Sequence, residues 1–258
     1  MQVRALGTSG GIGQGLRTTA FLVDGWLLVD AGSGVGDLTA AELGGIRDVL
    51  LTHAHLDHTA YLGLMADARI GDGSPPIRVH APVPTLDALR EHLFNGALWP
   101  DFTAIPTPQE PVLTFEPLDP DQARTLGAFQ ITPLPARHSI PSVGYRIDDG
   151  SGSLVFSGDT GSCPELRTRL EQIGMPDALI IECAFPDALE SLARQVGHYT
   201  PAQLVEELRH WPAGVQVWVT HLKPGAAARI EQELREHAAA AGVHCELLRG
   251  GDLLQIGR

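Results

Sequence analysis

Leu50-Leu51-Thr52-His53-Ala54-His55-Leu56-Asp57-His58 places three histidines and a carboxylate within the six residues 53–58. The apolar run 48–51 at its start has the character of a buried strand. Neutral imidazole and carboxylate groups are natural ligands for Zn²⁺ and similar divalent ions. Strand side chains alternate, so we expect the first two histidines to project to the same side and the aspartate and last histidine to lie in the following turn. One short loop could thus serve two neighbouring metal ions.

Three further candidate ligands follow apolar strands later in the chain. His138 follows the run 131–137, Asp159 follows 153–158, and His221 follows 216–220. A single histidine or aspartate after a strand is more often a helix cap or a surface residue. Together with the histidine-rich loop, however, these residues supply the additional ligands that a site for two metal ions needs.

The composition limits the classes of partner and compartment. The chain has 258 residues, a formal net charge of −13 and a pI near 5.2, and it contains no run of Lys or Arg. An acidic surface disfavours general attraction to phosphate backbones, so we expect no nucleic-acid partner. The sequence shows no signal peptide and no run of roughly 18 apolar residues, which favours a cytoplasmic protein without membrane contact. Its three cysteines lack metal-type spacing and imply no disulfide framework.

The pattern of apolar residues predicts a single domain, 1–258, in which strands and helices are mixed. Strands are expected at 3–6, 20–23, 26–30, 48–51, 77–80, 145–148, 154–157, 178–182 and 215–220, and helices at 60–68, 84–98, 163–173, 226–241 and after Thr200. The segments 245–248 and 253–256 are expected to form a closing hairpin. The glycine-rich segment 7–15 matches neither the P-loop nor the dinucleotide fingerprint, and a tight turn is the simpler interpretation.

An aromatic group, Phe94, Trp99 and Phe102, surrounds the end of the expected helix 84–98. Aromatic residues at this spacing usually belong to a hydrophobic core. Trp-Pro-Asp-Phe, however, ends the helix with two large rings in a loop, where rings are costly to expose unless something covers them. A purine base would be a suitable cover, and both interpretations stay open.

The order of the candidate ligands resembles that of the metallo-β-lactamase superfamily. Within it, the chain is similar to the class II cyclic-nucleotide phosphodiesterases through THAHLDH, HLFNGALWPDF, ARHSIPSVGY, FSGDTG, IIECAFPD, GHYTP and THLKP, which occur in this order. Several of these motifs also resemble the tRNA 3′-processing endonucleases, and the WPDF segment separates the two branches. The resemblance implies a four-layered αββα sandwich with the metals between two sheets, and it suggests a homodimer.

The resemblance also implies a set of ligands for two divalent ions. His53, His55 and His138 would hold the first ion, Asp57, His58 and His221 the second, and Asp159 would bridge both. Zn²⁺ is the expected metal, although the same ligands accept Mn²⁺ or Fe²⁺. Asp30, in Asp30-Ala31-Gly32, resembles the superfamily's aspartate that orients a metal ligand.

Cleavage of a phosphodiester also requires a proton for the departing sugar oxygen. Two metal ions can generate a nucleophile from water and neutralise phosphate oxygens, and His198, oriented by Glu182, is the candidate proton donor. We therefore expect Asp57, His198 and Glu182 to act in catalysis. The simpler alternative is that His198 only precedes a helix cap.

Three functions compete at this point. A phosphodiesterase acting on 3′,5′-cyclic AMP or GMP accounts for the metal site, the proton donor and the WPDF segment. A tRNA 3′-processing nuclease would be expected to carry a basic RNA-docking arm, which the sequence lacks. A non-catalytic binding protein on the same fold would be expected to lack ligands, whereas all seven positions are filled.

Overall fold

The computed structural model describes residues 1–120 and 122–257, which form two seven-stranded sheets and a small hairpin. The first sheet has the order β16 (Leu253–Gln255), β1 (Gln2–Gly7), β2 (Ala20–Val23), β3 (Leu27–Val29), β4 (Asp48–Leu50), β5 (Ile77–Ala81) and β8 (Leu113–Pro117). The second has the order β15 (Glu246–Leu247), β14 (Gln216–Thr220), β13 (Ala178–Glu182), β12 (Ser153–Phe156), β11 (Val143–Asp148), β10 (Phe129–Pro135) and β9 (Arg124–Leu126). β6 (Pro106–Thr107) pairs with β7 (Glu110–Pro111).

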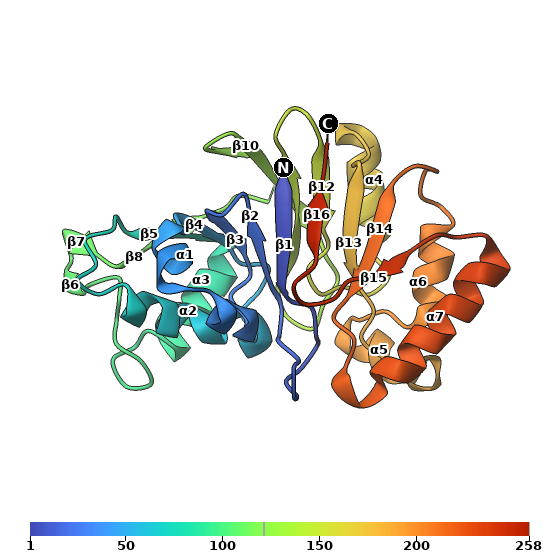
Figure 1. The fold of residues 1–258 in the computed structure, drawn as a ribbon, viewed down its shortest axis with the longest axis horizontal. Helices are drawn as coiled ribbons and strands as arrows, with labels where there is room; N and C mark the ends of the chain where they lie inside the picture. Colours follow the sequence, from blue (N-terminus) through green and yellow to red (C-terminus); the bar gives the residue numbers. More distant parts are fainter. Residues whose placement is uncertain (121, 258) are drawn as a thin grey trace.

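Helices lie on the outer face of each sheet, so the molecule has four layers (Figure 1). α1 (Ala40–Gly45), α2 (Leu56–Ala68) and α3 (Val83–His92) lie beside the first sheet, and α4 (Pro164–Ile173), α5 (Glu190–Val196), α6 (Pro201–Leu208) and α7 (Ala227–Ala241) lie beside the second. Short 3₁₀ turns occupy η1 (Ser33–Asp37), η2 (Asp187–Leu189) and η3 (Pro224–Ala226). The predicted αββα sandwich is confirmed.

Three hydrophobic cores hold these layers together. Leu62 of α2 and Leu86 of α3 pack against the first sheet, while Leu204 of α6 and Ile230 of α7 pack against the second. The core between the sheets contains the buried ring of Tyr145. Burial of apolar side chains on both faces of each sheet explains why most of its strands are apolar runs rather than alternating patterns.

The strand directions bring the candidate ligands to one edge. In the first sheet β3, β4, β5 and β8 are parallel, and in the second β12, β13, β14 and β15 are parallel. β10 also runs with β12, because β11 is antiparallel to both. The loops after β4, β10, β12 and β14 carry the candidate ligands, and ligand sites typically lie at the carboxyl ends of such strands.

The expected closing hairpin, 245–248 with 253–256, is wrong. β15 pairs with β14 in the second sheet, whereas β16 pairs with β1 in the first. The glycines at 250 and 251 indicate a turn, but turn chemistry does not specify which strand the chain will join. The connection between β15 and β16 therefore crosses from the second sheet to the first.

The helix expected at 84–98 is also shorter than predicted, since α3 ends at His92. Asn95 and Gly96 stop it: Oδ1 of Asn95 accepts the backbone N–H groups of Ala97 and Leu98, and Gly96 adopts a φ of 74°. The leucine periodicity before this point carries no information about such a stop. By contrast, α6 begins after Thr200 as predicted, with Pro201 as its first residue.

None of the helices in residues 1–120 and 122–257 combines the length and the apolar composition that crossing a bilayer requires.

Candidate metal centre

The first group of ligands is a triad of histidine rings. His53 and His55 follow β4, and His138 follows β10. Nε2 of His53 and Nε2 of His138 both lie 3.1 Å from Nδ1 of His55. A neutral imidazole has one N–H and one lone pair, so three ring nitrogens pointing at one another cannot all be satisfied by hydrogen bonds. A cation among them would accept all three lone pairs, and the triad therefore fits a metal ion.

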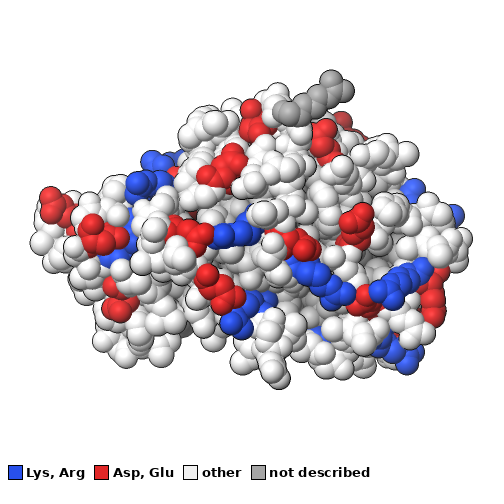
Figure 2. Space-filling view, in the orientation of Figure 1, with Lys and Arg blue, Asp and Glu red and all other residues white. Residues whose placement is uncertain are grey.

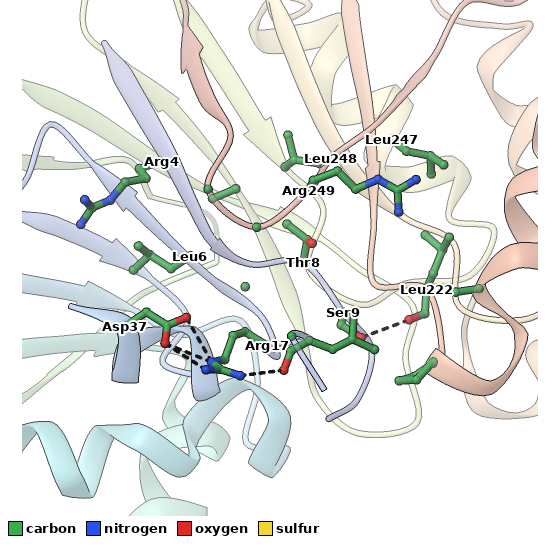
Figure 3. A pocket seen from close by; sticks show the side chains of 18 residues that line it. Arg4, Leu6, Thr8, Ser9, Arg17, Asp37, Leu222, Leu247, Leu248 and Arg249 are labelled. Carbon is green, nitrogen blue, oxygen red and sulfur yellow. Dashed lines mark hydrogen bonds and ion pairs between the residues drawn. The ribbon is translucent and has the colours of Figure 1, made fainter. Parts of the chain in front are cut away.

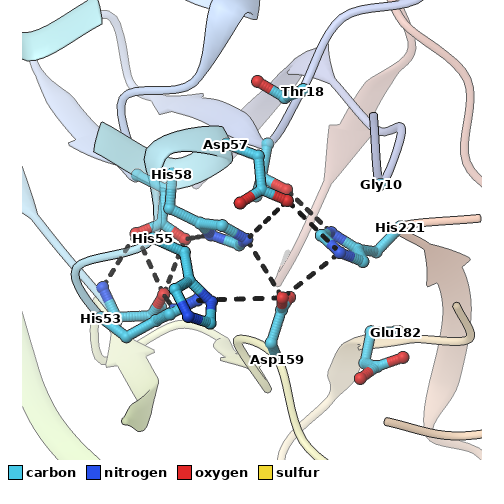
Figure 4. A network of polar contacts seen from close by, with 12 residues as sticks. Gly10, Thr18, His53, His55, Asp57, His58, Asp159, Glu182 and His221 are labelled. Atoms are coloured by element: carbon cyan, nitrogen blue, oxygen red, sulfur yellow. Dashed lines mark hydrogen bonds and ion pairs between the residues drawn. The ribbon is translucent and has the colours of Figure 1, made fainter. Parts of the chain in front are cut away.

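A second group, Asp57, His58, Asp159 and His221, adjoins the triad (Figure 4). Oδ2 of Asp159 lies 3.3 Å from Nε2 of His58 and 3.2 Å from Nε2 of His221. Nε2 of both histidines is buried and has no hydrogen-bond partner among the described residues. Buried polar atoms are rarely left without a partner, so these two nitrogens also fit the ligands of a metal ion.

Asp159 connects the two groups. Its Oδ2 atom lies 3.9 Å from Nε2 of His53 in the triad and also faces the histidines of the second group. One carboxylate thus reaches both positions, as the resemblance implied for a bridging ligand. The clusters suit a centre with two metal ions.

The expectation that Asp57 and His58 lie in a turn is wrong. Both belong to the first turn of α2, which begins at Leu56 after the N-cap residue His55. The helix starts immediately after the strand-end histidines, so it fixes the angle between the two groups of ligands. An aspartate at this position also lies at the positive end of the helix dipole.

Most of the histidines are oriented by a second partner on the ring nitrogen that faces away from the centre. The contacts are Asp30 Oδ2 to His58 at 2.7 Å, Thr52 Oγ1 to His53 at 2.9 Å, the Gly197 carbonyl to His138 at 3.0 Å, and Thr19 Oγ1 to His221 at 3.2 Å, each to Nδ1. Such partners select the tautomer and the ring orientation. The predicted contact of Asp30 with a ligand is confirmed, whereas those of Thr19 and Gly197 had no signal in the sequence beyond their place in the chain.

His221 is held by the glycine-rich segment near the N-terminus. Its φ of 66° is left-handed, and its backbone N–H donates to the carbonyl of Thr8 at 2.8 Å. A Cβ atom on Gly10 would lie 2.5 Å from the carbonyl oxygen of His221. The absence of a side chain at Gly10 therefore allows the two backbones to approach, and the surrounding hydrogen bonds sustain the strained backbone of His221.

Glu182 and His198 form a buried pair beside these ligands. Glu182 ends β13, His198 follows α5, and Nδ1 of His198 lies 2.5 Å from Oε1 of Glu182. The Glu182 carboxylate also accepts the backbone N–H of Thr160 at 3.1 Å. The His198 ring is 7% exposed and lies 4.8 Å from the His138 ring, centroid to centroid. The structure thus brings the predicted proton donor next to the metal ligands.

Burial and charge set the protonation of these rings. Burial lowers the pKa of His53 well below its usual value and that of His221 to about 3, so both rings are neutral, as metal ligands must be. Burial also lowers the pKa of His198, but the Glu182 carboxylate outweighs it and the net pKa is raised. The Glu182 carboxylate thus favours the protonated form of the His198 ring.

Comparison with known proteins agrees with this arrangement. Residues 25–236 match the family of β-lactamase superfamily domains. The chain belongs to the metallo-β-lactamase superfamily. With its clustered ligands, it is a metal-dependent hydrolase of that superfamily.

The relatives of the chain include cyclic-nucleotide phosphodiesterases and ribonucleases Z. A probable 3′,5′-cyclic-nucleotide phosphodiesterase of Yersinia pestis is 27% identical over 86% of this chain and 78% of its own. Ribonuclease Z of Mycobacterium marinum is 32% identical over 89% of this chain and 87% of its own. The crystal structure of unliganded yeast PDE1 superposes with a TM-score of 0.81 at 20% identity, and covers 99% of both chains.

The aromatic group expected to cover a base is mostly core. Phe94 and Phe102 are 3% and 0% exposed, and their rings contact each other beneath α3 with centroids 6.3 Å apart. Of the two interpretations of these phenylalanines, their burial agrees with core packing, because the helix-covered face of the first sheet takes up both rings. Trp99 is half-buried and donates its indole N–H to the carbonyl of Gly63 in α2 at 3.2 Å. Trp99 of the WPDF segment therefore packs against α2, the helix that carries Asp57 and His58.

Proposed function

We propose that the chain is a dinuclear-metal phosphodiesterase that hydrolyses 3′,5′-cyclic nucleotides to 5′-nucleoside monophosphates. The observation that carries the proposal is the buried Glu182–His198 pair beside seven clustered ligands. Two divalent ions, with Zn²⁺ the expected metal, would supply a nucleophile from water and neutralise the phosphate oxygens. The chain's own residues would supply the remaining step.

His198 would complete the reaction by protonating the departing sugar oxygen. That oxygen leaves as an alkoxide of high pKa, so a positioned acid accelerates the step by about 10²–10⁴. The Glu182 carboxylate holds the Nδ1 side of the ring at 2.5 Å and leaves the Nε2 side for the substrate. The Glu182 carboxylate raises the pKa of His198, which favours the protonated ring that this step requires.

The charge distribution favours a small substrate over tRNA. The formal net charge is −13, and Figure 2 shows acidic and basic side chains interspersed over one face of the molecule. Most of the arginines have a carboxylate within ion-pair distance, as Arg4 has in Glu42 and Arg124 in Glu116. Paired cations attract a polyanion weakly, and binding to a phosphate backbone depends on many free ones.

A tRNA 3′-processing nuclease is the second candidate, because ribonuclease Z relatives match as much of the chain as the phosphodiesterases do. Product analysis with 3′,5′-cyclic AMP, 2′,3′-cyclic AMP and a precursor tRNA in parallel distinguishes the two. We expect 5′-AMP from 3′,5′-cyclic AMP and no cleavage of the tRNA. Efficient removal of the tRNA trailer without turnover of cyclic AMP would replace the proposal by the second candidate.

A further inference from the structure

A groove begins at the metal ligand His138 and has a volume of about 1090 Å³. It runs between the carboxyl ends of β5 and β8 in the first sheet and the segment that joins β10 to β11 in the second. Its walls are largely apolar and include Val83, Pro84, Pro117 and Ile140. Ligand pockets are typically apolar clefts of about 300–1,000 Å³ with a few polar groups, so the groove has the size and character of a binding site.

Two arginines, Arg137 and Arg169, also line this groove. Arg137 is exposed and Arg169 is half-buried. Among the residues that the structure describes, neither has a carboxylate within ion-pair distance, and the guanidinium of Arg169 has only the amide oxygen of Gln172 as a partner, at 3.4 Å. Among the described lining residues, two arginines stand against one carboxylate, that of Asp119.

A second cavity, of about 530 Å³, is also lined by arginines, but these arginines are paired with carboxylates (Figure 3). Arg4, Arg17 and Arg249 line it, but each has an acidic partner: Glu42, Asp37 and Glu231, respectively. Those guanidinium groups are already neutralised by the protein. Arg137 and Arg169 in the groove are not neutralised in this way, and a guanidinium fork matches the geometry of a phosphate.

The groove and the proposed proton donor both adjoin the same metal ligand, His138. His198, the proposed proton donor, contacts the ring of His138, where the groove begins. A nucleoside whose 3′-oxygen is protonated by His198 would therefore extend into the groove. A phosphate on the 5′ side of that nucleoside would then approach the two arginines.

We propose that the groove binds a second phosphate, one nucleoside away from the reacting phosphodiester, and that linear dinucleotides with a 5′-phosphate are substrates. This rests on the proposed phosphodiesterase chemistry. In 5′-phosphoadenylyl-(3′→5′)-adenosine (pApA), water adds to the bridging phosphorus and the bond from phosphorus to O3′ breaks. His198 protonates O3′, and the products are two molecules of 5′-AMP. The step consumes one water and needs no other reactant.

The test compares pApA with ApA, which has the same scissile bond but no 5′-phosphate. We expect the metal-loaded protein to prefer pApA in kcat/KM by at least about tenfold, the effect of one charge-assisted hydrogen bond. Arg137→Gln and Arg169→Gln should each remove most of this preference through KM, while kcat/KM for ApA stays nearly constant. Arg47→Gln is the matched control, because Arg47 also lacks a carboxylate partner among the described residues but does not line the groove.

Equilibrium binding to the metal-loaded His198→Ala variant gives the same comparison with hydrolysis slowed by about 10²–10⁴. We expect pApA to bind at least about tenfold more tightly than ApA. Equal affinities and equal kcat/KM for the two ligands would overturn the groove assignment, even with cyclic AMP hydrolysis intact. An equal loss of preference in Arg47→Gln would reduce the effect to net charge and overturn it as well. Absence of all phosphodiester hydrolysis would instead refute the proposed function, while the binding ratio still decides about the groove.

Discussion

Replacement of His198 by alanine should separate proton donation from metal binding. The imidazole is buried and lies 2.5 Å from Glu182, and its ring centroid lies 4.8 Å from that of His138 and 5.6 Å from that of His221. Its removal should leave both metal ions in place and slow cyclic AMP hydrolysis by about 10²–10⁴. That range corresponds to about 3–5 kcal/mol of barrier, at 1.36 kcal/mol for each tenfold change.

The assay uses two substrates with different leaving groups. Bis-p-nitrophenyl phosphate releases a phenolate that departs without a proton, so its hydrolysis should fall far less than that of cyclic AMP in His198→Ala. Removal of a metal ligand should harm both reactions. If His198→Ala, with two metals bound, slows both substrates equally, then His198 does not act as the acid.

Glu182→Gln provides a graded version of the same test. The amide can still hold the ring, but it loses the carboxylate charge that raises the pKa of His198. We expect a loss of about tenfold, the difference between a charge-assisted and a neutral hydrogen bond. In this variant His198 should lose its proton at a lower pH than in the wild type. The alkaline limb of the pH profile of kcat should therefore move to lower pH. An unchanged profile would contradict the role of the pair.

Three further substitutions test the centre and its surroundings. Asp159→Ala should leave clearly fewer than two ions per chain by metal analysis, because its carboxylate faces histidines of both groups; a fully loaded but inactive variant would refute the bridging role. Gly197→Ala should reduce metal content and lower the free energy of unfolding by at least about 1–2 kcal/mol, since Gly197 has a φ of 73° and an added Cβ would lie 2.6 Å from the Arg137 carbonyl oxygen. Denaturant titration measures the unfolding, and wild-type stability would contradict the contact. Phe102→Ala should lower the free energy of unfolding by about 3–5 kcal/mol while changing KM for cyclic AMP and for bis-p-nitrophenyl phosphate equally. A selective rise in KM for cyclic AMP would indicate that this ring contacts the base.

The metal centre was largely predictable because its ligands sit at strand ends. His53, Asp159 and His221 each follow an apolar run, and strands that run in the same direction bring such positions to one edge. A residue that orients a ligand was predictable only where its side chain is distinctive, as the carboxylate of Asp30 is. The carbonyl of Gly197 is a group that every residue has, so nothing in the sequence distinguishes it as the partner of a metal ligand.

The predictions that differ from the structure have a common cause. A local sequence pattern does not indicate which distant segment will pack or pair with it. A glycine turn at 250–251 looks the same whether the chain returns to its own strand or crosses to the other sheet, as it does between β15 and β16. Aromatic rings in a loop look exposed until the face that covers them is known, and for Phe94 and Phe102 that face is the core beneath α3. The unpaired state of Arg137 in its groove is likewise visible only in three dimensions.

The central claim, that seven clustered ligands and one proton donor form a dinuclear phosphodiesterase, is tested most directly by metal titration. The protein is stripped with a chelator and reloaded with Zn²⁺ or Mn²⁺ in steps, while bound ions per chain and hydrolysis of 3′,5′-cyclic AMP to 5′-AMP are measured in the same samples. We predict activity that reaches its maximum at two ions per chain and is absent in the stripped protein. Full activity at one ion or none, or two bound ions without any hydrolysis of cyclic AMP, would contradict the account.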